Sequence, residues 1–189
     1  VISRIRYYIE QKKNSNIEEV ISCEYKGDSL DGIISYLEKI DGEDIVEKGI
    51  LKLSCGTRNE DPQFPLSNLI KYNSNDVNKY FYNHFNSNPQ QEKVAWIEFD
   101  FCHLKVNLSS YTIRSYGYGS GGCHPKSWRI VGSNDGKQWD TLDHQVNNPN
   151  LNGSNRQIRF ECENNNNYYR FIRFYQEDAW HSETYKYYF

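Results

Sequence analysis

The hydrophobic positions of this chain follow two periods, and the change between them falls near Gly49. Before Gly49, apolar residues recur three or four positions apart, which is the spacing of one helix face. After it, over residues 51–55, apolar and polar residues alternate as they do in a half-buried strand. The pattern predicts a helical lead-in or linker over residues 1–48 and a β domain over residues 49–189.

Three segments of the lead-in carry helical spacing. The first covers residues 1–9, whose apolar side chains share one helical face. In the second, Asn16 and Glu19 resemble a capping box ahead of an apolar run that also fits a strand. The third follows Ser29 and ends at Gly42, and its stripe predicts a helix that packs against another element. The residues of this stripe are Leu30, Ile33, Ile34, Leu37 and Ile40.

The β domain contains seven further segments with the composition and alternation of strands. They cover residues 96–101, 108–115, 127–133, 139–143, 156–162, 168–175 and 184–189. The sequence Asn134-Asp135-Gly136 joins two of them, since Asp-Gly tolerates the positive φ angles of a tight hairpin. Short strands with regular turn signals predict a mainly β fold, an antiparallel β-sandwich.

Composition agrees with a β-rich protein and narrows the choice of partners. The 189 residues include 16 Tyr, 9 Phe and 4 Trp, which suit a pleated, half-buried surface. The formal net charge is −3 and the two signs are mixed, so no one-signed field favours nucleic acid or a membrane surface. No run of eighteen apolar residues exists, so we expect no membrane span. Nothing in the pattern specifies an oligomeric state.

The cysteines indicate a reducing compartment. Their number is odd and their spacing wide, unlike the dense framework that staples small secreted domains. They are Cys23, Cys55, Cys102, Cys123 and Cys162. We therefore expect reduced thiols in a cytoplasmic protein.

Six short motifs occur in order along the chain. They are WIEFDF at 96–101, YTIRS at 111–115, HPKSW at 124–128, GSNDG at 132–136, LNGSNR at 151–156 and YRFIRF at 169–174. Together they resemble the discoidin, or F5/8 type C, domain family over residues 94–189, and more loosely over 49–93. The resemblance implies an eight-stranded, galactose-binding-like jelly roll. Members of the family include lectins, lipid-binding modules and intracellular adaptors, so the fold alone leaves the function open.

The lead-in adds a finer resemblance. LDGIISYL at 30–37 and EKGI at 47–50 are similar to segments that precede this module in cytoplasmic proteins with BTB domains or ankyrin-type repeats. This implies a non-catalytic recognition module that binds a protein partner as part of a larger adaptor. The alternative is a carbohydrate-binding module of the galactose-type lectin class.

Patterns for catalysis and metal binding are incomplete. Residues 117–122 fit G-x-G-x-x-G, but a predicted strand follows in place of the helix that would hold a pyrophosphate. The Cys-His pairs at Cys102 and Cys123 lack second ligands at zinc spacing, and no G-x-S-x-G elbow is present. Some relatives use structural calcium, for which six oxygen ligands cannot be assembled here. We expect no enzyme and no cofactor, with structural calcium as the open alternative.

Alternating strand directions place the connections at two ends of the sandwich. The long ones, residues 57–93, 116–126, 146–155 and 176–183, fall at one end. The short turns at 102–107, 134–138 and 164–167 fall at the other. Long loops on a rigid scaffold commonly carry recognition, and the family resemblance implies binding at one end of the barrel. The candidate ligand-binding residues are Arg114, Tyr116, Tyr118, His124 and Trp180.

Other aromatic and basic residues are interpreted as structural. Trp96, Trp128 and Trp139 lie in predicted strands, where large aromatics usually fill the interior. Arg170 and Arg173 are expected to pair with carboxylates such as Asp100 or Glu98. For Arg114 both roles stay open, and His124 has the alternative of fixing a turn through the backbone.

Overall fold

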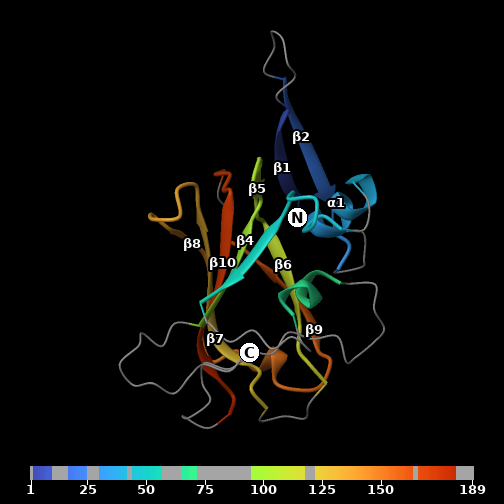
Figure 1. Ribbon diagram of the computed structural model, residues 1–189. Helices are drawn as coiled ribbons and strands as arrows, with labels where there is room; N and C mark the ends of the chain where they lie inside the picture. The colour runs from blue at the N-terminus through green and yellow to red at the C-terminus, as the bar shows by residue number, and fades with distance from the viewer. Residues whose placement is uncertain are drawn as a thin grey trace.

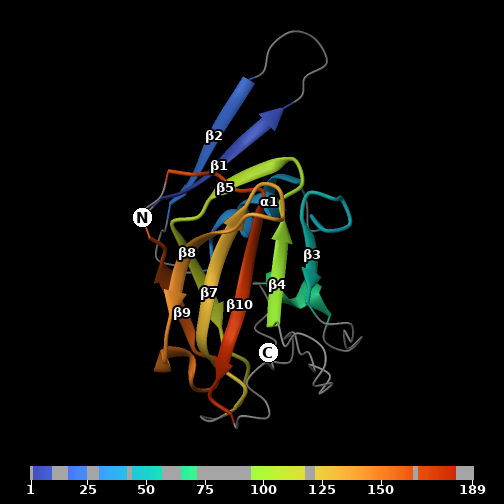
Figure 2. The same cartoon turned by 90° about the vertical axis from the view of Figure 1, so that its left-hand side faces the viewer.

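Two layers of antiparallel strands form the body of the molecule in the computed structural model (Figure 1). The residues that the structure describes are 2–9, 17–24, 30–41, 44–56, 65–71, 95–117, 122–163 and 166–181. The first layer is a five-stranded sheet in the order β3-β4-β10-β7-β8, seen face-on in Figure 2. Its strands are β3 (Lys52–Cys55), β4 (Ala95–Asp100), β7 (Pro125–Ser133), β8 (Asp140–Gln145) and β10 (Phe171–Ala179).

The second layer contains β5, β6 and β9. Strand β6 (Ser110–Arg114) pairs with β9 (Gln157–Glu161), with Tyr111 opposite Phe160. Strand β5 (Leu104–Asn107) joins the hairpin of β1 (Ile2–Ile9) and β2 (Ile17–Glu24) in the order β2-β1-β5. Two short 3-10 helices, η1 (Leu66–Ile70) and η2 (Pro149–Leu151), lie in the connections. These elements confirm the predicted mainly β, antiparallel fold.

Because successive side chains of a strand point to opposite faces, every second side chain points into a core that the two layers share. Trp128 of β7 is fully buried, and its ring contacts Phe160 of β9 edge-on with centroids 5.1 Å apart. Phe174 of β10 stacks on Trp128 from within its own sheet, with centroids 6.3 Å apart. The role predicted for Trp128 in the interior is therefore confirmed.

The helical lead-in is confirmed only at α1 (Ile33–Asp41). Leu37 of α1 is fully buried and belongs to the same core cluster as Trp128, together with Ile45 and Leu51. The apolar stripe predicted to pack on another element covers part of the sandwich core through Ile33 and Leu37, whereas Ile40, also predicted in the stripe, is exposed. The division between a lead-in and a β domain at residues 48 and 49 stays a prediction.

The helix predicted over residues 1–9 is wrong, because Ile2–Ile9 forms strand β1. The second segment, for which a strand was the alternative, forms β2 and pairs with β1 along its whole length. β-Branched and aromatic residues favour a strand, and pairing of β1 with β5 supplies the long-range contact that a local period cannot show. In Figure 1 this hairpin extends beyond the body of the molecule.

Strand β5 corrects a second prediction, in which residues 102–107 formed only a turn. Residues 104–107 instead pair with β1, and Val106 also bridges to Tyr169. Leu104 and Val106 are buried in the core, which explains why so short a segment is held as a strand. The strand predicted over residues 184–189 lies outside the described residues.

The β7–β8 hairpin has the predicted turn chemistry. Gly136 has a φ of 69°, a left-handed conformation that glycine adopts without strain. The Asp135 carboxylate accepts hydrogen bonds from the backbone N–H groups of Gln138 and Lys137, and these bonds lower the pKa of Asp135. The two strands that it joins are antiparallel neighbours.

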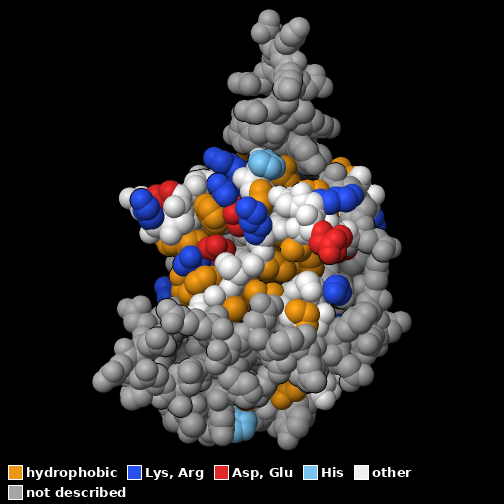
Figure 3. Space-filling view, viewed as in Figure 1, with side chains coloured by type: hydrophobic (Ala, Val, Ile, Leu, Met, Phe, Trp, Pro, Cys, Tyr) orange, Lys and Arg blue, Asp and Glu red, His pale blue; other side chains and the backbone are white. Residues whose placement is uncertain are grey.

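The outer face of the five-stranded sheet carries the predicted ion pairs. Arg170 binds Asp100 through Nε and Nη2, at 2.7 and 2.9 Å, and Arg173 Nε lies 2.6 Å from Glu98 Oε2. Burial alone would raise the pKa of Asp100, but hydrogen bonds from Arg170 and the Cys102 N–H outweigh it and lower that pKa. In Figure 3, charged side chains of both signs lie among hydrophobic ones on the described part of the visible face.

Trp96 and Trp139 lie on this outer face, so their predicted place in the interior is wrong. Both are half-buried, and the Arg173 guanidinium lies 4.3 and 4.2 Å from their ring centroids. On β4 it is the neighbours of Trp96, Ala95 and Ile97, that are buried. The alternation of side chains along β4 therefore places Trp96 on the outer face, where the Arg173 guanidinium covers its ring.

Gly132 of β7 provides a test of the packing between the layers. A Cβ at this position would lie 2.6 Å from Cγ of Tyr169, whose ring is buried and whose hydroxyl donates to Asp140 at 2.9 Å. We expect Gly132→Ala to lower the free energy of unfolding by about 1–3 kcal/mol, because the fixed ring must move. Urea unfolding measures this loss. Gly32→Ala is the control, because a Cβ at Gly32 would meet nothing within 4 Å, and equal losses for the two variants would contradict the packing.

Candidate functional site

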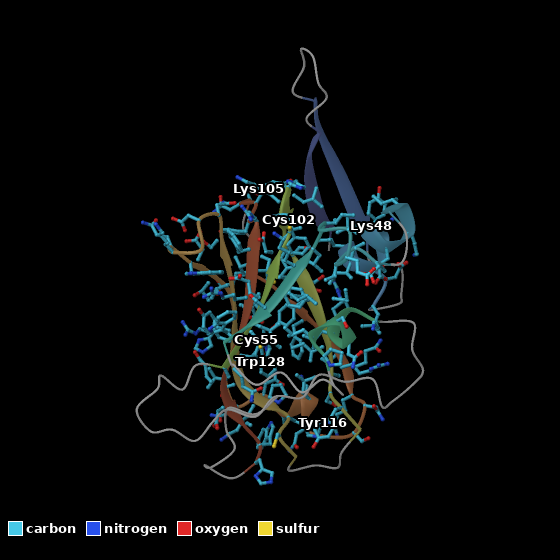
Figure 4. All side chains as sticks on the ribbon, viewed as in Figure 1. Lys48, Cys55, Cys102, Lys105, Tyr116 and Trp128 are labelled. Carbon is cyan, nitrogen blue, oxygen red and sulfur yellow. The ribbon has the colours of Figure 1, made fainter. Side chains whose placement is uncertain are left out.

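Strand directions bring the described parts of the connections that follow β6, β8 and β10 to one end of the sandwich, as predicted, while most of the predicted connection over residues 57–93 lies outside the described residues. Strands β6, β8 and β10 end there and β7 and β9 begin there, since each of the pairs β6–β9, β7–β8 and β10–β7 is antiparallel. We call this the loop end and define it by the described residues 114–117, 122–126, 146–156 and 178–181. Figure 4 shows Tyr116 at the loop end and Cys102 and Lys105 at the opposite end.

Ser115 ties the chain after β6 to the chain before β9. Its buried hydroxyl donates to the Gly153 carbonyl at 2.5 Å and accepts from the Arg156 N–H at 2.9 Å. One residue further, the Asn155 N–H donates to the Tyr116 carbonyl at 3.2 Å. These bonds fix the backbone of Tyr116 in the second layer.

Trp180, immediately after β10, is held in place by its backbone and by its indole nitrogen. Its backbone N–H donates to the His124 carbonyl at 3.0 Å, and Nε1 donates to the Asn148 carbonyl at 3.3 Å. The ring is only partly buried. The polar edge of the indole is thus bonded to the protein, while part of its apolar surface remains accessible.

Lys126 and Asp178 form an ion pair beside this ring. Lys126 Nζ lies 2.7 Å from Asp178 Oδ2 and 5.6 Å from the centroid of the Trp180 ring. The Asn148 N–H also donates to the Lys126 carbonyl at 2.8 Å. Asn148, Lys126 and Trp180 therefore hold one another in one arrangement, built from β7, β10 and the η2 connection.

His124 lies beneath this group and contacts Tyr116. Its side chain is 1% exposed, and its ring centroid lies 5.2 Å from that of Tyr116. The bond from the Trp180 N–H to the His124 carbonyl fixes the main chain at the turn into β7, and the role of the buried imidazole stays a prediction. In this arrangement His124 supports Tyr116 and Trp180 from the interior.

The structure brings three of the five candidate residues together. Tyr116 contacts His124, and His124 bonds Trp180. Arg114 is the last residue of β6 and lies opposite Gln157, on the face that alternates with the core-facing Tyr111 and Ile113. It therefore borders the loop end from the outer face of the second layer. Tyr118 lies outside the described residues.

Three residues near Trp180 are missing from the candidate set predicted from the sequence. They are Lys126, Asn148 and Asp178, and no motif singles them out as a group. The sequence pattern does not place Asp178 in a strand, because the predicted strand ends at residue 175 whereas β10 continues to Ala179. An irregular register between Gln176 and Ala179 sets its position, and no local pattern predicts such a bulge.

The thiols of this chain are free, and most of the glycine-rich segment, residues 118–121, lies outside the described residues. All five cysteines are free, and burial raises the pKa of Cys23, Cys102, Cys123 and Cys162, the last to about 12. These thiols stay protonated near neutral pH, which disfavours them as nucleophiles. In the described ranges, no three His, Cys, Asp or Glu side chains gather at metal-binding distance, and none of the helices could span a bilayer. After the glycine-rich segment the chain enters strand β7.

Comparison with known proteins gives a family match. The model of the F5/8 type C domain matches residues 54–187. A structure of CpGH89CBM32-6, produced by Clostridium perfringens, is similar with 21% identity and a TM-score of 0.47, covering 72% of this chain and 90% of the other. CpGH89CBM32-5 from Clostridium perfringens, in complex with GalNAc-beta-1,3-galactose, has 13% identity, a TM-score of 0.49, and coverage of 70% and 87%. A search of curated proteins found no match.

A third similar structure is the C-terminal domain of a chitobiase from Bacteroides fragilis. It has 16% identity and a TM-score of 0.46, and the alignment covers 66% of this chain and 80% of that domain. The family match confirms the resemblance inferred from the six motifs. The finer resemblance to modules beside BTB domains or ankyrin-type repeats stays a prediction.

Proposed function

Because the chain belongs to the F5/8 type C domain family, we propose that it is a non-catalytic carbohydrate-binding module whose loop end takes a sugar ring against Trp180. The observation that carries the proposal is the arrangement of Trp180 itself. Its indole N–H and backbone N–H are both bonded to the protein, while its ring is only partly buried. A fixed, partly open aromatic ring is suited to the apolar face of a sugar.

The groups around Trp180 supply the polar half of such a site. Sugar recognition needs an apolar surface for C–H groups and a few placed donors and acceptors for hydroxyls. Lys126 and Asp178 are each 29% exposed beside the ring, so they can reach hydroxyl groups of a bound sugar. Tyr116, packed on His124, extends the aromatic surface toward the second layer. Arg114 is proposed as a further donor at the border of the site.

The described surface favours a sugar over a protein partner. Protein interfaces usually contain a contiguous apolar centre. The exposed large hydrophobic side chains in the described ranges are Ile40 of α1, Leu69 of η1 and Val146 of the connection after β8, so they belong to three separate segments. A site made of one or two rings among polar groups matches a small polar ligand better. Binding of a protein, expected from the lead-in, therefore remains the less supported interpretation.

Trp180→Ala tests the proposal directly. We expect wild-type protein to bind galactose- or N-acetylgalactosamine-terminated chains on a glycan array. Loss of the ring should weaken this binding by at least about tenfold, the scale of an aromatic anchor at the centre of a binding site. Isothermal titration with the best glycan from the array gives the affinity of each variant.

The matched control is Trp139→Ala, which removes a half-buried indole at the opposite end of the sandwich. It should leave the affinity unchanged, and thermal unfolding of both variants shows that they are folded. Equal affinity of wild type and Trp180→Ala for the glycan would contradict the proposed site. Binding of no glycan by wild type would contradict the proposed function itself.

A further inference from the structure

We propose that the Lys126–Asp178 ion pair makes the loop end selective for neutral sugars over acidic ones. This inference rests on the proposed function and names the ligand class of the same site. Lys126 is the cation that lies over the Trp180 ring, and Asp178 neutralises it at 2.7 Å. A sugar stacked on Trp180 would therefore meet a pair of charges that cancel.

Asp178 is held in this place by more than its salt bridge. Its Oδ1 accepts a hydrogen bond from the Ala179 N–H at 3.0 Å, while Oδ2 binds Lys126. The register of β10 against β7 shifts between Gln176 and Asp178 and again between Asp178 and Ala179. Such bulges re-aim side chains at the ends of sheets, and here Asp178 comes to lie opposite Ser127, beside Lys126.

The other described cations of the loop end come from the opposite layer. Arg114 ends β6 and Arg156 precedes β9, whereas Lys126, Asp178 and Trp180 belong to β7 and the end of β10. Among the described Lys, Arg, Asp and Glu side chains, the charges recorded beside the Trp180 ring are those of Lys126 and Asp178. If Asp178 loses its charge, Lys126 keeps a full positive charge 5.6 Å from the ring centroid.

The size of the effect follows from the distances. A carboxylate on a bound sugar would lie within several ångströms of both charges, where one uncompensated unit charge near a protein surface is worth roughly a tenfold change in affinity. In wild type the two contributions oppose each other, so a carboxylate gains little and loses hydration. Asp178→Asn keeps the shape and the acceptor for the Ala179 N–H but removes the compensation.

The experiment compares matched neutral and acidic ligands. The probes are methyl glucoside, methyl galactoside and methyl mannoside, each paired with the corresponding methyl hexuronide. We expect wild type to bind the neutral member of a pair more tightly. Asp178→Asn should shift the ratio toward the hexuronide by about tenfold at low ionic strength. Lys126→Gln should shift the ratio the other way.

Glu177→Gln is the matched control. It removes the same charge one residue earlier, but Glu177 binds Arg129 and His144 on the outer face of the sheet, at 2.5 and 2.9 Å. A change in overall charge would affect both variants alike, whereas a local effect is confined to Asp178→Asn. The shift should also shrink as salt is raised, because the pair is partly exposed to solvent.

The outcomes separate the two proposals. An equal shift in Asp178→Asn and Glu177→Gln, or a wild type that already prefers the hexuronide, would overturn the selectivity while leaving sugar binding intact. A ratio of neutral sugar to hexuronide that Asp178→Asn leaves unchanged, while binding of the neutral sugar still depends on Trp180, would do the same. If wild type binds none of the six probes and no glycan on the array, the proposed function fails and this inference fails with it.

Discussion

Leu37→Ala is expected to destabilise the whole sandwich, although Leu37 lies outside the residues matched by the family model. Its side chain is fully buried in the core cluster that also contains Trp128 and Leu51. Truncating a buried leucine removes its transfer free energy and leaves a cavity, which costs about 2–5 kcal/mol. Urea unfolding followed by tryptophan fluorescence measures this loss, because Trp128 reports on the core between the sheets.

The same helix offers a matched control. Ile40 is 48% exposed, so Ile40→Ala removes a similar side chain with little change in burial and should alter the free energy of unfolding by less than about 1 kcal/mol. Unfolding of Leu37→Ala at the wild-type urea midpoint would show that α1 is not part of the cooperative unit. A single shifted transition would show that the folded unit extends from the sandwich to α1.

The strands of the sandwich could be predicted because each buries one face in the same core. In β7 and β10 the core cluster includes Trp128, Ile130, Ile172 and Phe174, whose large apolar side chains make the two-residue period visible in the sequence. The segment that forms β1 carries apolar residues whose spacing fits either a helix face or a strand. Its pairing with β5, about a hundred residues later, decides between them. A local pattern contains no information about so distant a partner.

The end of the sandwich that carries the proposed site could be predicted from strand direction, but the contacts of its residues could not. Alternating directions suffice to gather Tyr116, His124 and Trp180 at the loop end. The ion pair beside Trp180 depends on the extra length of β10 and on its register shifts near Asp178. Likewise, burial of His124 follows from the way Tyr116 and Trp180 lie around it, which is a tertiary property.

Tyr111→Phe is expected to have a comparable cost, because one hydroxyl connects two buried groups. The Tyr111 hydroxyl donates to Asp143 Oδ2 at 2.5 Å and accepts from Trp128 Nε1 at 2.8 Å. Burial and the bond to Asp143 raise the pKa of Tyr111, so the phenol stays protonated. Removing it leaves the Trp128 N–H without this acceptor and the buried Asp143 without this donor. An unsatisfied buried group costs about 1–3 kcal/mol and a charged one more, so we expect a loss of about 2–5 kcal/mol in urea unfolding.

Two further variants identify the cause of that loss. Tyr175→Phe removes a hydroxyl that accepts from Arg173 at 2.8 Å on the outer face, where water can replace it, so its cost should stay below about 1 kcal/mol. In the Tyr111→Phe background, Asp143→Asn should recover part of the stability, since a neutral amide is less costly to bury than a carboxylate that has lost a donor. Equal costs for the two Tyr→Phe variants, or a further loss on adding Asp143→Asn, would mean that the connection through Tyr111 does not stabilise the core.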